Sequence, residues 1–152
     1  MNRTAETGPI SPEGVYRTSS LIAFALVMGP TLYAIVALFL QHGAGHLSFD
    51  MMTIVWIAFT VATIAAARLL WGKLVEPALP RMGWRTEPIS VGDAGRIQSG
   101  LIVTWGLLEG SALFGLVVYS VAGSYITLAG ALVVLFIGLL ATRPRRAYFG
   151  LR

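Results

Sequence analysis

Four long stretches with almost no charged side chains restrict how this chain can fold. They cover residues 18–40, 51–71, 97–121 and 124–142, and their only charges are Arg68, near the end of the second stretch, and Glu109, inside the third. A helix rises about 1.5 Å per residue, so about 20 apolar residues cross a hydrocarbon layer about 30 Å thick. The pattern predicts an all-α integral membrane protein with four transmembrane helices arranged as two hairpins.

The composition excludes several other classes of protein. Hydrophobic residues make up 56% of the chain and charged residues only 12%, whereas soluble domains carry about 25% charged residues. There is no cysteine, which argues against a disulfide-linked scaffold. The net charge of +4 would suit a nucleic-acid partner only if the basic residues formed one patch, and they do not, so we expect no nucleic-acid partner.

The positions of lysine and arginine indicate the topology. All 11 of these residues lie before the first stretch, around the connection between the second and third, or after the fourth. Because short basic loops stay in the cytoplasm, both termini and the loop 73–96 are predicted to be cytoplasmic. The first stretch starts well inside the chain and is too long for a cleaved signal peptide. We therefore expect a multi-pass protein of the cell inner membrane.

The loop 73–96 is predicted to be an irregular connection and not a second domain. It contains three prolines and three glycines, Pro77, Pro80, Pro88, Gly83, Gly92 and Gly95. Residues of these two types interrupt helices. The whole chain, 1–152, is thus predicted to form a single four-helix domain. Trp71 suits the headgroup level, while Trp56 and Trp105 fall inside spans as packing or lipid-facing residues.

Two helical stretches share a weak sequence similarity. Residues 25–40 and 106–121 align at a constant offset of 81 with four identities, one of which pairs Gly29 with Gly110. A duplication would make the two hairpins parallel copies, as in some membrane folds. A chance alignment of two apolar helices explains the same identities, and both interpretations stay open.

Glu109 is the one acidic residue placed deep inside a predicted span. It lies twelve residues into the third stretch, or roughly 18 Å at helical rise, near the bilayer midplane. An acidic side chain there costs about 2.5–3.5 kcal/mol on insertion scales, so we expect it to be neutral, paired or lining a polar path.

The residues around Glu109 are unusually small. Gly106 and Gly110 form a GxxxG motif, and Thr104, Ser111 and Gly115 line another stripe of the same helix. Small residues let helix backbones approach, and hydroxyl groups form hydrogen bonds across helices. The third helix is therefore predicted to be an assembly helix. Glu109 either forms a structural hydrogen bond with a neighbouring helix or handles protons or cations.

The segment EGSALFGLVV, residues 109–118, resembles the ion-binding helix of rotary ATPase proteolipid (c) subunits, which commonly reads like EAxAIYGLVV. The resemblance covers about one helix. It implies that Glu109 is the carboxylate that binds the transported proton or sodium ion. Ser111 and Thr104 would then be the supporting oxygens.

Gly29 and Pro30 interrupt the first stretch near its middle. Proline has no N–H to donate to the carbonyl oxygen four residues earlier, so a kink is expected there. Such a break can expose carbonyl oxygens to an ion or substrate. The simpler interpretation is a bend that packing accommodates.

Metal and cofactor ligands are scarce. His42 and His46 are spaced like paired metal ligands, but Gly43 and Gly45 weaken the helix that would align them. We therefore expect the two histidines to be polar residues of a surface loop and not a metal site. No histidine or cysteine lies inside a span, which argues against haem or iron–sulfur ligation there. Any other cofactor stays unknown.

The sequence favours a non-enzymatic function. No P-loop, HExxH or GxSxG motif is present. We expect an accessory or scaffold subunit of a larger energy-transducing or other multi-subunit membrane complex, in contact with lipid and with other transmembrane subunits or further copies of itself. The alternative is a proteolipid-like proton or cation carrier that uses Glu109.

Overall fold

The chain folds into four long helices in a computed structural model that describes residues 11–41, 47, 50–79 and 90–149. The helices are α1 (Pro12–Gln41), α2 (Met51–Leu70), α3 (Val91–Ala122) and α4 (Tyr125–Thr142). Each of them, with short extensions, is long and apolar enough to cross a membrane. The prediction of an all-α, four-helix, multi-pass membrane fold is confirmed.

The connection between α2 and α3 is shorter than the sequence predicts. A π-helical turn η1 (Trp71–Val75) and a 3-10 turn η2 (Glu76–Ala78) continue α2, and α3 already begins at Val91. Ser90 explains the early start of α3, because its hydroxyl oxygen accepts a hydrogen bond of 3.0 Å from the Asp93 amide and so caps the helix. Both ends of the 73–96 loop are therefore helical, despite Gly92 and Pro77.

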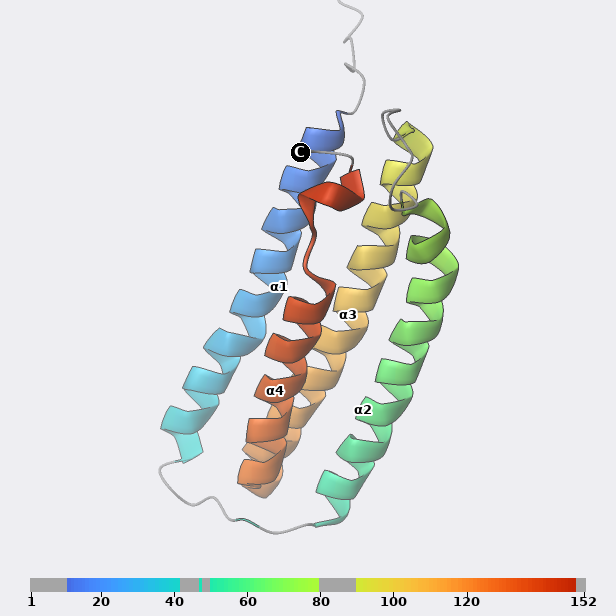
Figure 1. Ribbon diagram of the computed structural model, residues 1–152. Helices are drawn as coiled ribbons and strands as arrows, with labels where there is room; N and C mark the ends of the chain where they lie inside the picture. The colour runs from blue at the N-terminus through green and yellow to red at the C-terminus, as the bar shows by residue number, and fades with distance from the viewer. Residues whose placement is uncertain (1–10, 42–46, 48–49, 80–89, 150–152) are drawn as a thin grey trace, which may run out of the picture.

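α3 is the central helix of the bundle. It packs against α1, α2 and α4, whereas α1 and α2 share almost no contact among the described residues. In Figure 1, α1 and α2 lie on opposite sides of the α3–α4 pair. The most deeply buried large side chains accordingly come mainly from α3: Ile97, Leu101, Trp105, Leu116 and Tyr119. Burial of Trp105 and Trp56 identifies both as packing residues.

A two-residue turn joins α3 to α4. Gly123 adopts φ 72°, a left-handed conformation that glycine reaches at little cost. Its N–H donates to the Tyr119 carbonyl at 2.7 Å and closes the end of α3. Ser124 follows directly and α4 begins at Tyr125, so these two helices form a tight antiparallel hairpin.

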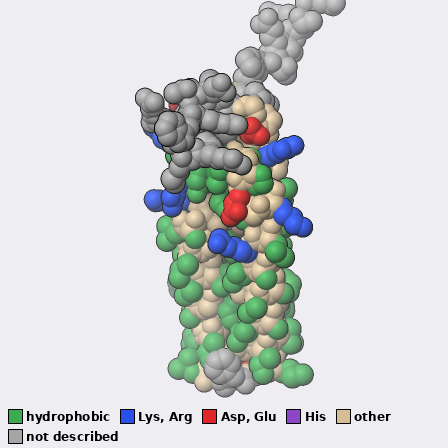
Figure 2. Space-filling model, turned by 45° about the vertical axis from the view of Figure 1, so that its right-hand side comes forward, with side chains coloured by type: hydrophobic (Ala, Val, Ile, Leu, Met, Phe, Trp, Pro, Cys, Tyr) green, Lys and Arg blue, Asp and Glu red, His purple; other side chains and the backbone are tan. Residues whose placement is uncertain are grey.

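Charged side chains gather at one end of the bundle, which we call the basic end. On the face drawn in Figure 2, they lie near that end above a broad band of hydrophobic side chains. The start of α1 and the last described turn, η3 (Arg146–Phe149), both lie at this end (Figure 1). Phe149 of η3 is buried and packs edge to face on Tyr16 of α1, with ring centroids 6.0 Å apart.

The band below the basic end has the surface of a membrane protein. Large apolar side chains of all four helices are exposed there, for example Phe24 on α1, Val61 on α2, Val117 on α3 and Leu140 on α4. Soluble proteins rarely expose so much contiguous apolar surface. Lipid contact around the helices follows from this band.

Candidate functional site

Glu109 lies on α3, on the side that faces α1, and is half-buried. A methyl group placed on Gly29 of α1 would lie 3.7 Å from Oε1 of Glu109. The bare backbone of Gly29 therefore borders the carboxyl group. Among the described residues, Glu109 forms no hydrogen bond and no ion pair. The fold places this carboxyl group beside α1, where none of the described residues is its polar partner.

Pro30 lies directly beside that contact. It is buried, and α1 continues as one helix through it. Its nitrogen has no hydrogen, so it cannot donate to the carbonyl oxygen of Leu26. The predicted kink at Gly29 and Pro30 stays a prediction.

Ser111 faces α2 and not Glu109. Its hydroxyl lies 2.8 Å from the Thr60 hydroxyl, and its carbonyl oxygen accepts a 3.0 Å hydrogen bond from Nε1 of Trp56. Thr104 lines a pocket between α2, α3 and α4. At about 100° per residue, Ser111 is turned about 200° and Thr104 about 140° from Glu109. The structure does not bring the three predicted ion-binding residues together.

Two residues of α2, Trp56 and Thr60, contact Ser111; the sequence predicted Trp56 only as a packing or lipid-facing residue and gave no role to Thr60. The Trp56 ring fills a slot between α3 and α4: a methyl group on Gly115 would lie 2.5 Å from its Nε1 and 2.9 Å from Cβ of Ala131. Gly115 is thus a packing glycine within the chain. The sequence pattern that could have predicted this contact is a tryptophan and a threonine one helical turn apart, on the same face of an apolar helix.

Gly106 and Gly110 lie on a different face of α3. Both are exposed, and a methyl group on either would meet nothing within 4 Å. Ile102, Val103 and Val117 are exposed along the same helix. This open face of α3, defined by Gly106, Gly110 and the three apolar residues, has Glu109 at its edge, and no other described element covers it.

Metal ligands do not cluster in the part of the chain that the structure describes. No group of three or more histidine, cysteine, aspartate or glutamate side chains occurs there. His42 and His46 lie outside the described residues. Asp50 caps α2, because its Oδ1 accepts a 2.6 Å hydrogen bond from the Thr53 amide.

Comparison of the chain with protein families, curated proteins and solved structures finds no match.

Proposed function

We propose that this protein is a non-enzymatic accessory subunit of a larger membrane complex and that it binds a transmembrane helix of another subunit on the open face of α3. One observation carries the proposal: a half-buried carboxyl group without a described polar partner lies at the edge of an exposed surface that contains two bare glycines. Other faces of α3 pack against α1, α2 and α4.

The energetics favour a polar partner for Glu109. An acidic side chain in the middle of a lipid layer costs about 2.5–3.5 kcal/mol. A hydrogen bond between membrane helices returns about 0.6 kcal/mol on average and up to about 1.7 kcal/mol. A partner helix offsets part of the cost if it offers a hydroxyl, amide or imidazole at the depth of Glu109, and it also removes the carboxyl group from lipid.

The geometry of the two glycines suits such a partner. Gly106 and Gly110 are one helical turn apart and have open space above them, so a second backbone can approach closely. The distribution of lysine and arginine favours a cytoplasmic location for the basic end, in the cell inner membrane. The partner helix then crosses the same membrane beside α3.

Copurification of the full chain from its native membranes in mild detergent tests this proposal. Gly110→Ile fills the open face and should abolish a stoichiometric complex with the partner subunit. The matched control Ala65→Ile adds the same side chain to an exposed site on α2 and should retain the complex. Retention of the complex by Gly110→Ile would refute the proposed docking face.

Substitutions at Glu109 separate hydrogen bonding from charge. Glu109→Gln should leave assembly nearly intact, since an amide still donates and accepts, whereas Glu109→Leu should weaken it. Loss of assembly with Gln but retention with Asp would indicate that the partner needs a carboxylate.

A second candidate is a proteolipid-like proton or cation carrier. It is supported by the position of Glu109, whose carboxyl group lies at the contact between α3 and Gly29 of α1, and by the resemblance of residues 109–118 to a proteolipid ion-binding helix. Glu109 should then react with a hydrophobic carbodiimide, and the bound ion should protect it. A closed ring of identical subunits would support the carrier, and the absence of ion-protected labelling would exclude it.

A further inference from the structure

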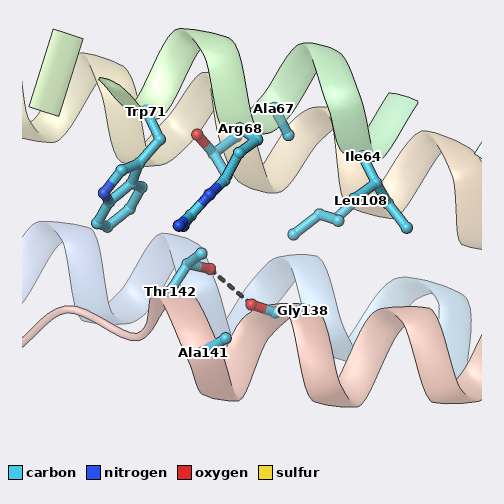
Figure 3. A pocket seen from close by; sticks show the side chains of 9 residues that line it. Ile64, Ala67, Arg68, Trp71, Leu108, Gly138, Ala141 and Thr142 are labelled. Carbon is cyan, nitrogen blue, oxygen red and sulfur yellow. Dashed lines mark hydrogen bonds between the residues drawn. The ribbon is translucent and has the colours of Figure 1, made fainter. Parts of the chain in front are cut away.

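A pocket of about 280 Å³ opens between α2, α3 and α4 near the basic end, away from Glu109. Its lining comes from all three helices and from the first residue of η1, and includes Ile64, Arg68, Trp71, Thr104, Leu108 and Thr142. In Figure 3 the Arg68 side chain reaches from α2 across the pocket toward Thr142 of α4. Ile64, Arg68 and Ala141 are exposed, so the pocket is accessible from the surface of the bundle.

The polar groups of the pocket lie at about the same depth along the bundle, toward the basic end. Thr142 lies opposite Thr104 and Trp105 in the α3–α4 pair, and its hydroxyl accepts a 3.0 Å hydrogen bond from Nε1 of Trp105. The same hydroxyl donates to the Gly138 carbonyl at 2.8 Å. Thr142 is therefore satisfied, whereas Arg68 forms no hydrogen bond or ion pair among the described residues.

Thr104 has a buried polar atom without a partner in the described part of the chain. The residue is only 2% exposed, and its hydroxyl oxygen has no hydrogen-bond partner among the described residues, although Thr104 lines the pocket. Buried hydroxyl groups are nearly always hydrogen-bonded, and leaving one without a partner is unfavourable. A ligand that brings an acceptor oxygen into the pocket would satisfy both Thr104 and Arg68.

Apolar groups form the next level, further from the basic end. Ile64 and Leu108 lie on the side of Arg68 away from Trp71 (Figure 3). Gly138 packs against Leu108, since a methyl group on it would lie 2.8 Å from Leu108 Cδ1. The pocket is thus polar toward the basic end and apolar toward the middle of the bundle.

Trp71 lies at the rim and is held by the π-helical turn. The turn brings Val75 so close to α3 that a methyl group on Gly100 would lie 2.5 Å from Val75 Cγ2. Tyr148 of η3 packs edge to face on Trp71, with centroids 6.3 Å apart. An indole at this level suits the membrane interface, and π-helical turns frequently occur at functional sites.

We infer that the pocket binds an acidic phospholipid from the leaflet at the basic end, with a phosphate oxygen near Arg68 and Thr104 and the start of an acyl chain along Ile64 and Leu108. Arginine binds phosphate through paired N–H groups. At about 30 Å³ per water-sized group, 280 Å³ holds about nine such groups. That is room for a phosphate and the first methylenes, while the remaining chain lies along the outside of the bundle.

Thermal unfolding of the full chain in lipid nanodiscs tests the inference. Adding phosphatidylglycerol to phosphatidylcholine discs should raise Tm. Native mass spectrometry should show about tenfold preferential retention of phosphatidylglycerol, which is the ratio that one hydrogen bond to a charged group gives. Arg68→Gln should remove most of the Tm shift and of the preference. The matched control Arg96→Gln removes an exposed arginine of the same end that does not line the pocket and should preserve both.

Thr104→Val gives an independent measurement that does not depend on charge. Valine has the shape of threonine without the unpartnered hydroxyl, so Tm in pure phosphatidylcholine should rise while the gain from phosphatidylglycerol shrinks. Inorganic phosphate should not reproduce the gain. Equal effects of Arg68→Gln and Arg96→Gln, an unreduced gain in Thr104→Val, or a full gain from inorganic phosphate would each overturn the proposed lipid site.

Discussion

Glycines lie on two faces of α3, and their surroundings differ between the two faces. On the face toward α2 and α4, Gly115 makes room for the Trp56 ring, and the slot is full. On the open face, Gly106 and Gly110 have only empty space above them. A glycine in a membrane helix allows another group to approach the helix backbone closely. At Gly115 that group is the Trp56 ring of this chain, whereas no described residue approaches Gly106 or Gly110.

The polar groups on these two faces differ in the same way. The Ser111 hydroxyl on the packed face contacts Thr60 at 2.8 Å, and the Ser111 carbonyl accepts from Trp56. Glu109, beside the open face, has no described polar partner. Ser111 is thus satisfied by residues of this chain, whereas Glu109, beside the open face, has no polar partner among the described residues. Thr104 is the exception on the packed face, because its buried hydroxyl also lacks a described partner.

The largest expected difference between the faces comes from adding one methyl group to each. Gly115→Ala forces a carbon to 2.5 Å from Trp56 Nε1, and such overpacking costs about 1–3 kcal/mol of unfolding free energy. Gly110→Ala meets open space and should gain up to about 1 kcal/mol from helix propensity. Unfolding by sodium dodecyl sulfate from mixed micelles measures both.

Equal destabilisation by the two alanines would contradict the contrast between a filled and an open face. An unchanged unfolding free energy in Gly115→Ala would show that the Trp56 ring does not fill the slot beside Gly115.

A smaller effect should come from the hydrogen bond on the packed face. A double-mutant cycle with Thr60→Val and Ser111→Ala should give a coupling of about 0.6 kcal/mol, and not above about 1.7 kcal/mol, as other hydrogen bonds between membrane helices do. The same cycle with Ser111→Ala and Glu109→Gln should give no coupling, because Ser111 and Glu109 point to different sides of α3. A coupling in the second cycle would place them in one site after all.

The positions of the helices could be predicted because lipid imposes a simple rule on each one separately. Length and absence of charge locate a span without any knowledge of its neighbours, and α4 starts within one residue of the predicted 124–142 stretch. The sequence did not predict that the ends of the 73–96 loop are helical. That prediction relied on the proline and glycine content of the loop and did not consider that Ser90 caps α3.

The candidate site was harder to predict because it depends on the direction in which each side chain points. Thr104, Glu109 and Ser111 are close in sequence, yet helical geometry of about 100° per residue separates their directions. That argument was available from the sequence alone. The partners were not: Gly29 beside Glu109, Thr60 beside Ser111 and Arg68 near Thr104 follow only from how the four helices are arranged.

The scarcity of contact between α1 and α2 has a consequence for biosynthesis. Both helices pack on α3 and hardly on each other, so the first hairpin has little interface of its own when it enters the membrane. Membrane helices insert first and associate afterwards, and chains emerge from the ribosome in order. The main helix contacts of α1 and α2 can therefore form only after α3 has been synthesised. The ring contact between Tyr16 and Phe149 forms last, because η3 follows α4 in the chain.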